Sequence, residues 1–70
     1  MLTIKYKITE NSNPPEIDRT SSEPAEWQDR ITGDFTGYLW IITATKVGGE
    51  LQSYDSNNIW TEPTLISIVK

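Results

Sequence analysis

Carboxylates are the only candidates for acid–base catalysis in this chain of 70 residues, because it contains no histidine and no cysteine. A pair such as Asp29 and Asp34 would need a deep, water-excluding pocket to raise its pKa values into a useful range. So short a chain has too little mass to surround such a pocket. We therefore expect no enzymatic activity, no catalytic residue, and neither a cofactor nor a metal ion, since structural zinc sites are built from cysteine and histidine.

Three tryptophans and three tyrosines form the second group of residues that could bind a ligand, because exposed aromatic rings stack on the apolar faces of sugars. Trp27 and Trp60 lie beside prolines or turns, where a ring can stay exposed, and they are the candidates for a carbohydrate platform. Tyr38 and Trp40 lie on an alternating strand and are expected in the core, since each large aromatic ring buries roughly 150–250 Å². The sequence leaves the exposure of Trp27 and Trp60 open.

The charge of the chain excludes nucleic acid as an expected partner. Six basic and ten acidic residues give a net charge of −4, whereas phosphate binding depends on lysine and arginine. Seven of the ten acidic residues lie between Glu10 and Asp34, so the negative field belongs mainly to that segment.

No membrane or export segment is expected either. The longest apolar run, residues 38–42, is far shorter than the roughly 18 residues of a membrane-spanning helix. The chain begins Met-Leu-Thr-Ile-Lys, without the pattern of a signal peptide. We therefore expect a soluble protein that is cytoplasmic during its synthesis.

The first residues alternate between apolar and polar side chains and predict a half-buried strand over residues 2–9. One face of this strand holds Leu2, Ile4, Tyr6 and Ile8. The other face, which includes Lys5 and Lys7, is expected to meet water.

The most apolar stretch, GYLWIITATKVGGE, predicts the centre of the sheet as a strand over residues 38–47. Its alternation assigns a structural core to one face, made of Tyr38, Trp40, Ile42 and Ala44. Leu39 and Ile41 begin the opposite face, so both faces should be covered near the start of the strand.

Two further strands complete the expected sheet. The glycines at residues 48 and 49 supply the positive φ angles of a tight hairpin turn, which leads into a strand over residues 50–54. Pro63 interrupts any ladder before the last strand, over residues 64–69. The sequence thus predicts one small all-β domain over residues 1–70, with an antiparallel sheet of about four strands.

The connection over residues 10–36 is rich in proline and serine and shows no regular apolar pattern. So long a stretch without regular structure is uncommon inside a compact domain, and something must hold it in place. We expect Trp27 to be its main anchor and the connection to pack across one face of the sheet.

The second half of the chain resembles the second half of a fibronectin type III domain. The matching residues are Tyr38, Trp40, Ile42 and Ala44 at alternate positions, Gly49-Glu50 in the turn, and Trp60, Glu62 and Pro63 before a final β-branched strand. A domain of that family has about 100 residues. The resemblance therefore implies about half of an immunoglobulin-like sandwich, without its first strands.

The order of motifs along the chain also resembles small modules of bacteriophage and prophage tail and tail-fibre proteins. These motifs are TENSNPP at residues 9–15, Trp27, GYLW at residues 37–40, a glycine turn, and WTEP at residues 60–63. The chain departs from those modules where it has Asp-Arg-Ile at residues 29–31 and Ile-Ile-Thr at residues 41–43. The resemblance implies a location in the virion, in the phage tail.

Two functional hypotheses follow. In the first, the chain is a structural module of a phage particle that associates with itself or with another protein. The surface for this contact is expected to be the apolar sheet face that the connection leaves uncovered, lined by Leu39, Ile41, Ile66 and Ile68. In the second, the chain binds a carbohydrate or a host protein through Trp27 and Trp60.

Overall fold

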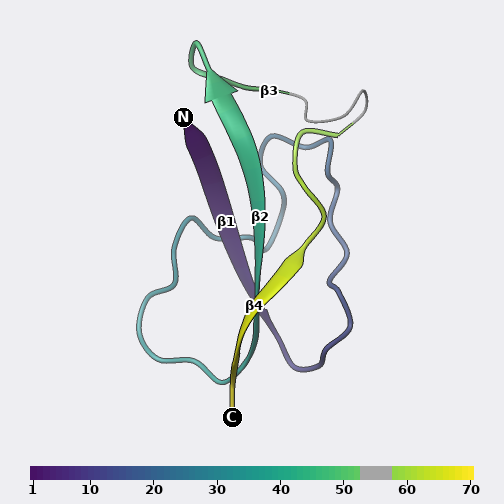
Figure 1. Ribbon diagram of the computed structural model, residues 1–70, viewed down its shortest axis with the longest axis vertical. Helices are drawn as coiled ribbons and strands as arrows, with labels where there is room; N and C mark the ends of the chain where they lie inside the picture. The colour runs from purple at the N-terminus through teal and green to yellow at the C-terminus, as the bar shows by residue number, and fades with distance from the viewer. Residues whose placement is uncertain (53–57) are drawn as a thin grey trace.

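The computed structural model describes residues 1–52 and 58–70 and contains one antiparallel sheet with long connections (Figure 1). Its four strands are β1 (Leu2–Thr9), β2 (Gly37–Val47), β3 (Glu50–Gln52) and β4 (Thr64–Val69). No helix occurs in the described residues. The prediction of an all-β chain with a small four-stranded antiparallel sheet is confirmed. The last two residues of the predicted strand over residues 50–54 lie outside the described part.

Strand β2 lies at the centre of the sheet and pairs with all three other strands. β1 runs along one edge of β2 over its full length, from Leu2 opposite Thr45 to Thr9 opposite Tyr38. The other edge is shared, because β4 pairs with the first half of β2 and β3 with its last residues. The sheet is therefore at most three strands wide, and only β1 pairs with residues 42–44 of β2.

The lysine-bearing face of β1 lies on the core side of the sheet, contrary to the expectation from the sequence. The register pairs Lys5 with Ile42 and Lys7 with Trp40, so both lysines share the side of the sheet that holds the buried core. Lys5 is 6% exposed, whereas Leu2 on the other side is 59% exposed. The prediction that the polar face of β1 meets water is wrong, because carboxylates of the residue 10–36 connection pair with the lysines on the core side.

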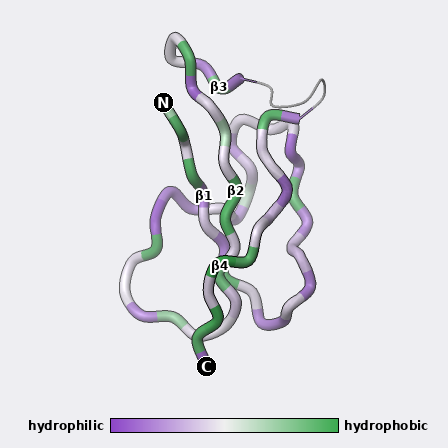
Figure 2. Tube along the Cα trace, viewed as in Figure 1, coloured by the Kyte–Doolittle hydropathy of each residue, from purple (hydrophilic) through white to green (hydrophobic). Residues whose placement is uncertain are grey.

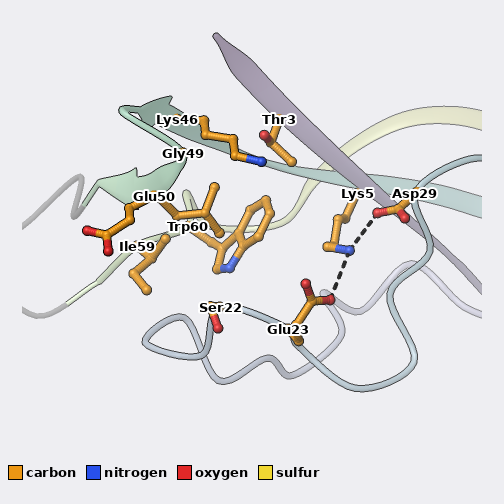
Figure 3. Close-up of a pocket in the computed structure, with 11 residues that line it drawn as sticks. Thr3, Lys5, Ser22, Glu23, Asp29, Lys46, Gly49, Glu50, Ile59 and Trp60 are labelled. Atoms are coloured by element: carbon orange, nitrogen blue, oxygen red, sulfur yellow. Dashed lines mark hydrogen bonds and ion pairs between the residues drawn. The ribbon is translucent and has the colours of Figure 1, made fainter.

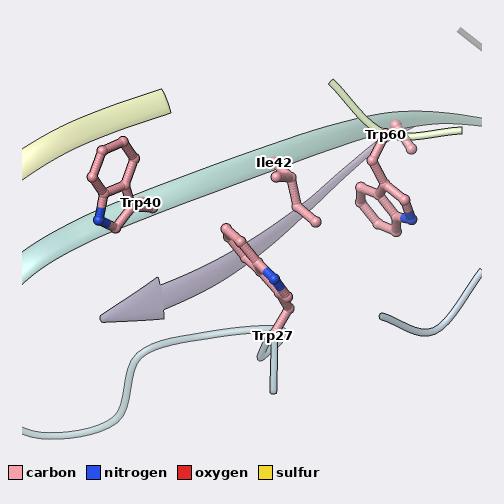
Figure 4. Close-up of a cluster of buried hydrophobic side chains, with 5 residues drawn as sticks. Trp27, Trp40, Ile42 and Trp60 are labelled. Atoms are coloured by element: carbon pink, nitrogen blue, oxygen red, sulfur yellow. The ribbon is translucent and has the colours of Figure 1, made fainter. Parts of the chain in front are cut away.

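Five buried side chains form the hydrophobic core: Trp27, Trp40, Ile42, Ala44 and Trp60 (Figure 4). Three of them come from one face of β2, as its alternation predicts, and Tyr38 from the same face is partly buried against them. The other two are the tryptophans that lie outside the strands. Trp27 comes from the residue 10–36 connection, and Trp60 comes from the segment that precedes β4. Each large ring fills space that so small a sheet cannot fill from its own strands.

Backbone hydrogen bonds join the residue 10–36 connection to the rest of the chain. Gln28 and Tyr6 exchange two of them, at 2.8 and 2.9 Å, on the edge of β1. The carbonyl oxygen of Arg19 accepts from the amides of Ile59, at 2.7 Å, and Trp60, at 3.2 Å. These bonds satisfy backbone groups of a segment that has no strand or helix of its own.

Strand β4 contains a register shift. Ser67 lies opposite Leu39, but the next pair is Leu65 with Trp40, so Ile66 is an extra residue in the ladder. Such a β-bulge changes which side of the sheet the residues before it face. Leu65 thereby reaches the core side, where it packs against the core.

Gly37 begins β2 beside Thr9, the last residue of β1. Its φ angle is 120°, and a Cβ atom there would lie 2.5 Å from the carbonyl oxygen of Thr9. No real Cβ atom tolerates that distance. A glycine is therefore required here both by the backbone conformation and by the neighbouring strand.

We expect Gly37→Ala to lower the free energy of unfolding by about 3 kcal/mol, because the new methyl group must push β1 away. Urea denaturation of the purified chain measures this loss. Gly33→Ala is the matched control, since Gly33 also has a positive φ but no described atom lies within 4 Å of the added Cβ. The control should cost only about 1 kcal/mol. Equal losses in the two variants would contradict the close approach of β1 to Gly37.

Candidate functional site

A cleft of about 550 Å³ lies on the core side of the sheet, between the hairpin end of β2 and the residue 10–36 connection (Figure 3). Lys5, Glu23, Asp29 and Lys46 contribute charges to its lining, and its apolar lining residues are Leu51, Ile59 and Trp60. The cleft therefore places lysine and carboxylate side chains close together beside the ring of Trp60.

The ammonium group of Lys5 is the central charge of this cleft. Its Nζ atom lies 2.6 Å from Oδ1 of Asp29 and 3.5 Å from Oε2 of Glu23, as the dashed lines in Figure 3 show. The hydrogen bond to Asp29 raises the pKa of Lys5, although burial of the ammonium acts in the opposite direction. The same hydrogen bond lowers the pKa of Asp29.

This arrangement keeps Lys5 charged and engaged at neutral pH. A lysine acts as a nucleophile or a base only when its pKa falls, and here the pKa moves upward. The ion pairs instead attach the residue 10–36 connection to β1, with a further pair between Lys7 and Glu26 at 3.2 Å. We interpret the charged cleft as a structural feature.

Within residues 1–52 and 58–70, no group of three or more carboxylates gathers in a way that could hold a metal ion. No helix in these residues is long and apolar enough to cross a membrane.

The opposite side of the sheet has a different character. Its residues on β1, β2 and β4 are Leu2, Ile4, Tyr6 and Ile8 of β1, Gly37, Leu39, Ile41, Thr43, Thr45 and Val47 of β2, and Thr64, Ser67 and Val69 of β4. None of these residues is charged. We call this set the uncharged face. Among the described strand residues, only Glu50 adds a charge to this side, opposite Val47 at the hairpin end.

The uncharged face combines partly buried residues at its centre with exposed apolar residues at its ends. Leu39 is 9% exposed beneath its neighbours, whereas Leu2 is 59%, Val47 57% and Val69 37% exposed. Figure 2 shows hydrophobic residues along β1, β2 and β4, whereas the connections are mostly hydrophilic. The face therefore presents its exposed apolar side chains mainly at the two ends of the sheet.

The structure separates the four residues that were predicted to line this face. Leu39 and Ile41 belong to it. Ile68 lies opposite Tyr38 on the core side, and Ile66 is the extra residue of the bulge, although both are about half exposed, at 51% and 49%. Ile68 is corrected by the register of β4, which pairs it with Tyr38, and Ile66 by the bulge; alternation within β4 shows neither its register nor its bulge.

Trp27 and Trp60, whose exposure the sequence leaves open, are both buried. Trp27 is 6% and Trp60 0% exposed, so neither ring presents a face to a sugar. The indole Nε1 of Trp60 donates to the carbonyl oxygen of Ser21 at 2.7 Å. The indole Nε1 of Trp27 finds no acceptor among the described residues.

Sequence reasoning missed the pairing of Lys5 and Lys7 with the residue 10–36 connection. A signal for it was present, because two lysines two residues apart on one strand face need carboxylates if that face is covered. The carboxylates are Glu23, Glu26 and Asp29, at three-residue intervals in the connection. The uncharged face could have been found by the same reasoning.

No protein-family model, curated protein or solved structure matches this chain. The class of protein must therefore be inferred from the residues and geometry described above.

The Lys5–Asp29 pair predicts a specific pH dependence. The lowered pKa of Asp29 contributes stability that is present above the ordinary carboxyl pKa of about 3.9 and is lost as the pH falls through the folded-state value. The raised pKa of Lys5 contributes stability that is present below about 10.4 and is lost as the pH rises through its folded-state value. Both contributions are complete at neutral pH.

We expect Asp29→Asn to lower stability at pH 7 and to make the acid side of the stability profile less steep than in the parent chain. Thermal unfolding from about pH 2 to pH 7 measures both effects, because this range covers the carboxyl titration. Asp34→Asn is the control, since Asp34 is exposed and forms no ion pair with a described residue. Identical acid profiles for the parent and Asp29→Asn would show that the pair contributes nothing.

Proposed function

We propose that this chain is a non-enzymatic structural and interaction module that acts through protein–protein contacts, as a component of a phage or prophage particle. The observation that supports the interaction role is the uncharged face. Monomeric soluble proteins rarely expose contiguous apolar patches larger than a few hundred Å², and such patches mark interaction sites. The apolar residues of β1 lie on this face, although the same strand could have buried them on the core side.

The proposed fold is a partial fibronectin type III or immunoglobulin-like sandwich. In this proposal the residue 10–36 connection takes the place of a second sheet and packs across one face. Its contributions to the core, Trp27 and the partly buried Ile17, support this proposal. So does its course in Figure 1, where it passes behind β2 before it reaches the edge of β1.

The phage-particle assignment rests on the order of sequence motifs. GYLW begins β2, the glycine turn joins β2 to β3, and WTEP precedes β4. The motif residues Trp27, Trp40 and Trp60 meet in one core although they are far apart in the sequence. Three of the motifs thus contribute to one packed unit, which supports the proposal of a single module.

The alternative of a carbohydrate-binding or host-protein-binding module loses its main support. It required Trp27 and Trp60 to be exposed, and both are buried. Trp40 is 4% exposed and Tyr38 is packed against the core, so neither of these rings replaces them. The interaction module is therefore the better account of the site.

The phage-particle proposal predicts that the chain copurifies with particles released by the cells that encode it. Particles are banded on a density gradient, and the chain is quantified by mass spectrometry against the major tail and capsid proteins. We expect a fixed ratio to a tail protein across gradient fractions. A chain that is abundant in the cell lysate but absent from banded particles would overturn the assignment. An abundant cytoplasmic protein serves as the control for contamination.

A further inference from the structure

The geometry points to a second copy of this chain as the occupant of the uncharged face. In this arrangement, two sheets pack face to face about a two-fold axis, so that two half-sandwiches complete one β-sandwich. The inference deepens the proposed interaction role, and rests on it, by naming the partner and the surface. Packed sheets lie about 10 Å apart with interdigitating side chains, which a face of leucine, isoleucine, valine, threonine and tyrosine can provide.

The chain exposes more surface than a compact monomer of its mass, which is consistent with contact with another chain. Its accessible surface is 4941 Å² for a mass of 8.0 kDa, whereas a compact monomer of this mass exposes about 4,450 Å². Its radius of gyration is 12.4 Å, compared with about 11 Å for a compact domain of this length. The excess of about 500 Å² is surface that a compact monomer of this mass would bury, and contact with a second chain would cover surface of this kind.

The distribution of charge favours a second copy over a charged partner. The chain has a net charge of −4, so two copies repel each other wherever their acidic surfaces meet. Glu23, Glu26 and Asp29 are held on the core side by Lys5 and Lys7. Contact through the uncharged faces places these acidic segments on the two outer sides of the dimer, away from each other.

The shape of the face also fits a symmetric contact. In a two-fold dimer the same patch serves both partners, so it must complement itself. Among the described strand residues of this side, the one charge is Glu50 at the rim, so none at the centre of the face needs an opposite charge across the interface. Pairing through the edge of β4 is less suitable, since the bulge at Ile66 interrupts the regular ladder that strand addition requires.

Sedimentation equilibrium of the full chain tests this inference. Over concentrations from about 1 µM to about 1 mM, we expect the average mass to rise from 8.0 kDa to twice that value. Ile4→Glu introduces a charge at the middle of β1 on the uncharged face, opposite Thr43. It should raise the dimer dissociation constant at least about 100-fold, because each dimer would bury two like charges.

Two further variants make the result decisive. Leu2→Glu, at a side chain that is 59% exposed, leaves folding intact and should weaken the dimer about tenfold. If circular dichroism shows that Ile4→Glu does not fold, Leu2→Glu tests the inference in its place. Ile68→Glu is the matched control, because Ile68 is 51% exposed but lies on the core side. It should leave the dissociation constant unchanged.

The inference is overturned if the parent chain remains a monomer up to the highest concentration, or if Ile68→Glu weakens the dimer as much as the variants of the uncharged face. These results are distinct from a failure of the particle proposal. A monomer that copurifies with particles would refute the dimer and retain the particle role. A dimer that is absent from particles would retain the uncharged face as the contact and refute the particle role.

Discussion

The attachment of the residue 10–36 connection to one side of the sheet is the constraint on which the rest of this structure depends. A sheet that is at most three strands wide cannot exclude water from its own face, and this chain has no disulfide to compensate. Trp60 is the centre of the attachment. Its ring is fully buried, its Nε1 bonds to Ser21 at 2.7 Å, and its carbonyl oxygen accepts from Nε of Arg19 at 2.9 Å. One residue thereby joins the core to the covering segment.

The attachment explains the unusual orientation of β1. The residue 10–36 connection is acidic, so the face of β1 that it contacts must supply positive charge. Lys5 and Lys7 supply it. The apolar face of β1 is then forced to the other side, since successive residues of a strand alternate. The apolar surface on the uncharged face is therefore a consequence of the ion pairs on the core side. The ion pairs on the core side place the apolar residues of β1 on the opposite side of the sheet.

Much of the fold could be predicted from the sequence, and the part that could not has a physical reason. Alternation and glycine placement predicted the strands over residues 2–9 and 64–69 and the core face of β2, because these signals are local. Alternation separates the two faces of β1 but does not say which one is covered. That depends on the path of the connection, which is set by contacts between distant residues such as Lys5 and Asp29. The bulge at Ile66 and the burial of Trp27 and Trp60 are likewise consequences of long-range packing.

Amide hydrogen exchange tests the central claim most directly, because it reports whether the connection is an integral part of the folded sheet. If it is, the amides of Gln28 and Trp60, which donate to Tyr6 and Arg19, should exchange as slowly as the amide of Ile42 in the centre of β2. We expect all three to be protected at least about 100-fold relative to an unstructured peptide, with exposed Glu16 as a reference for rapid exchange. Rapid exchange at Gln28 and Trp60 beside a protected Ile42 would show that the sheet folds without its covering segment, and would contradict the account.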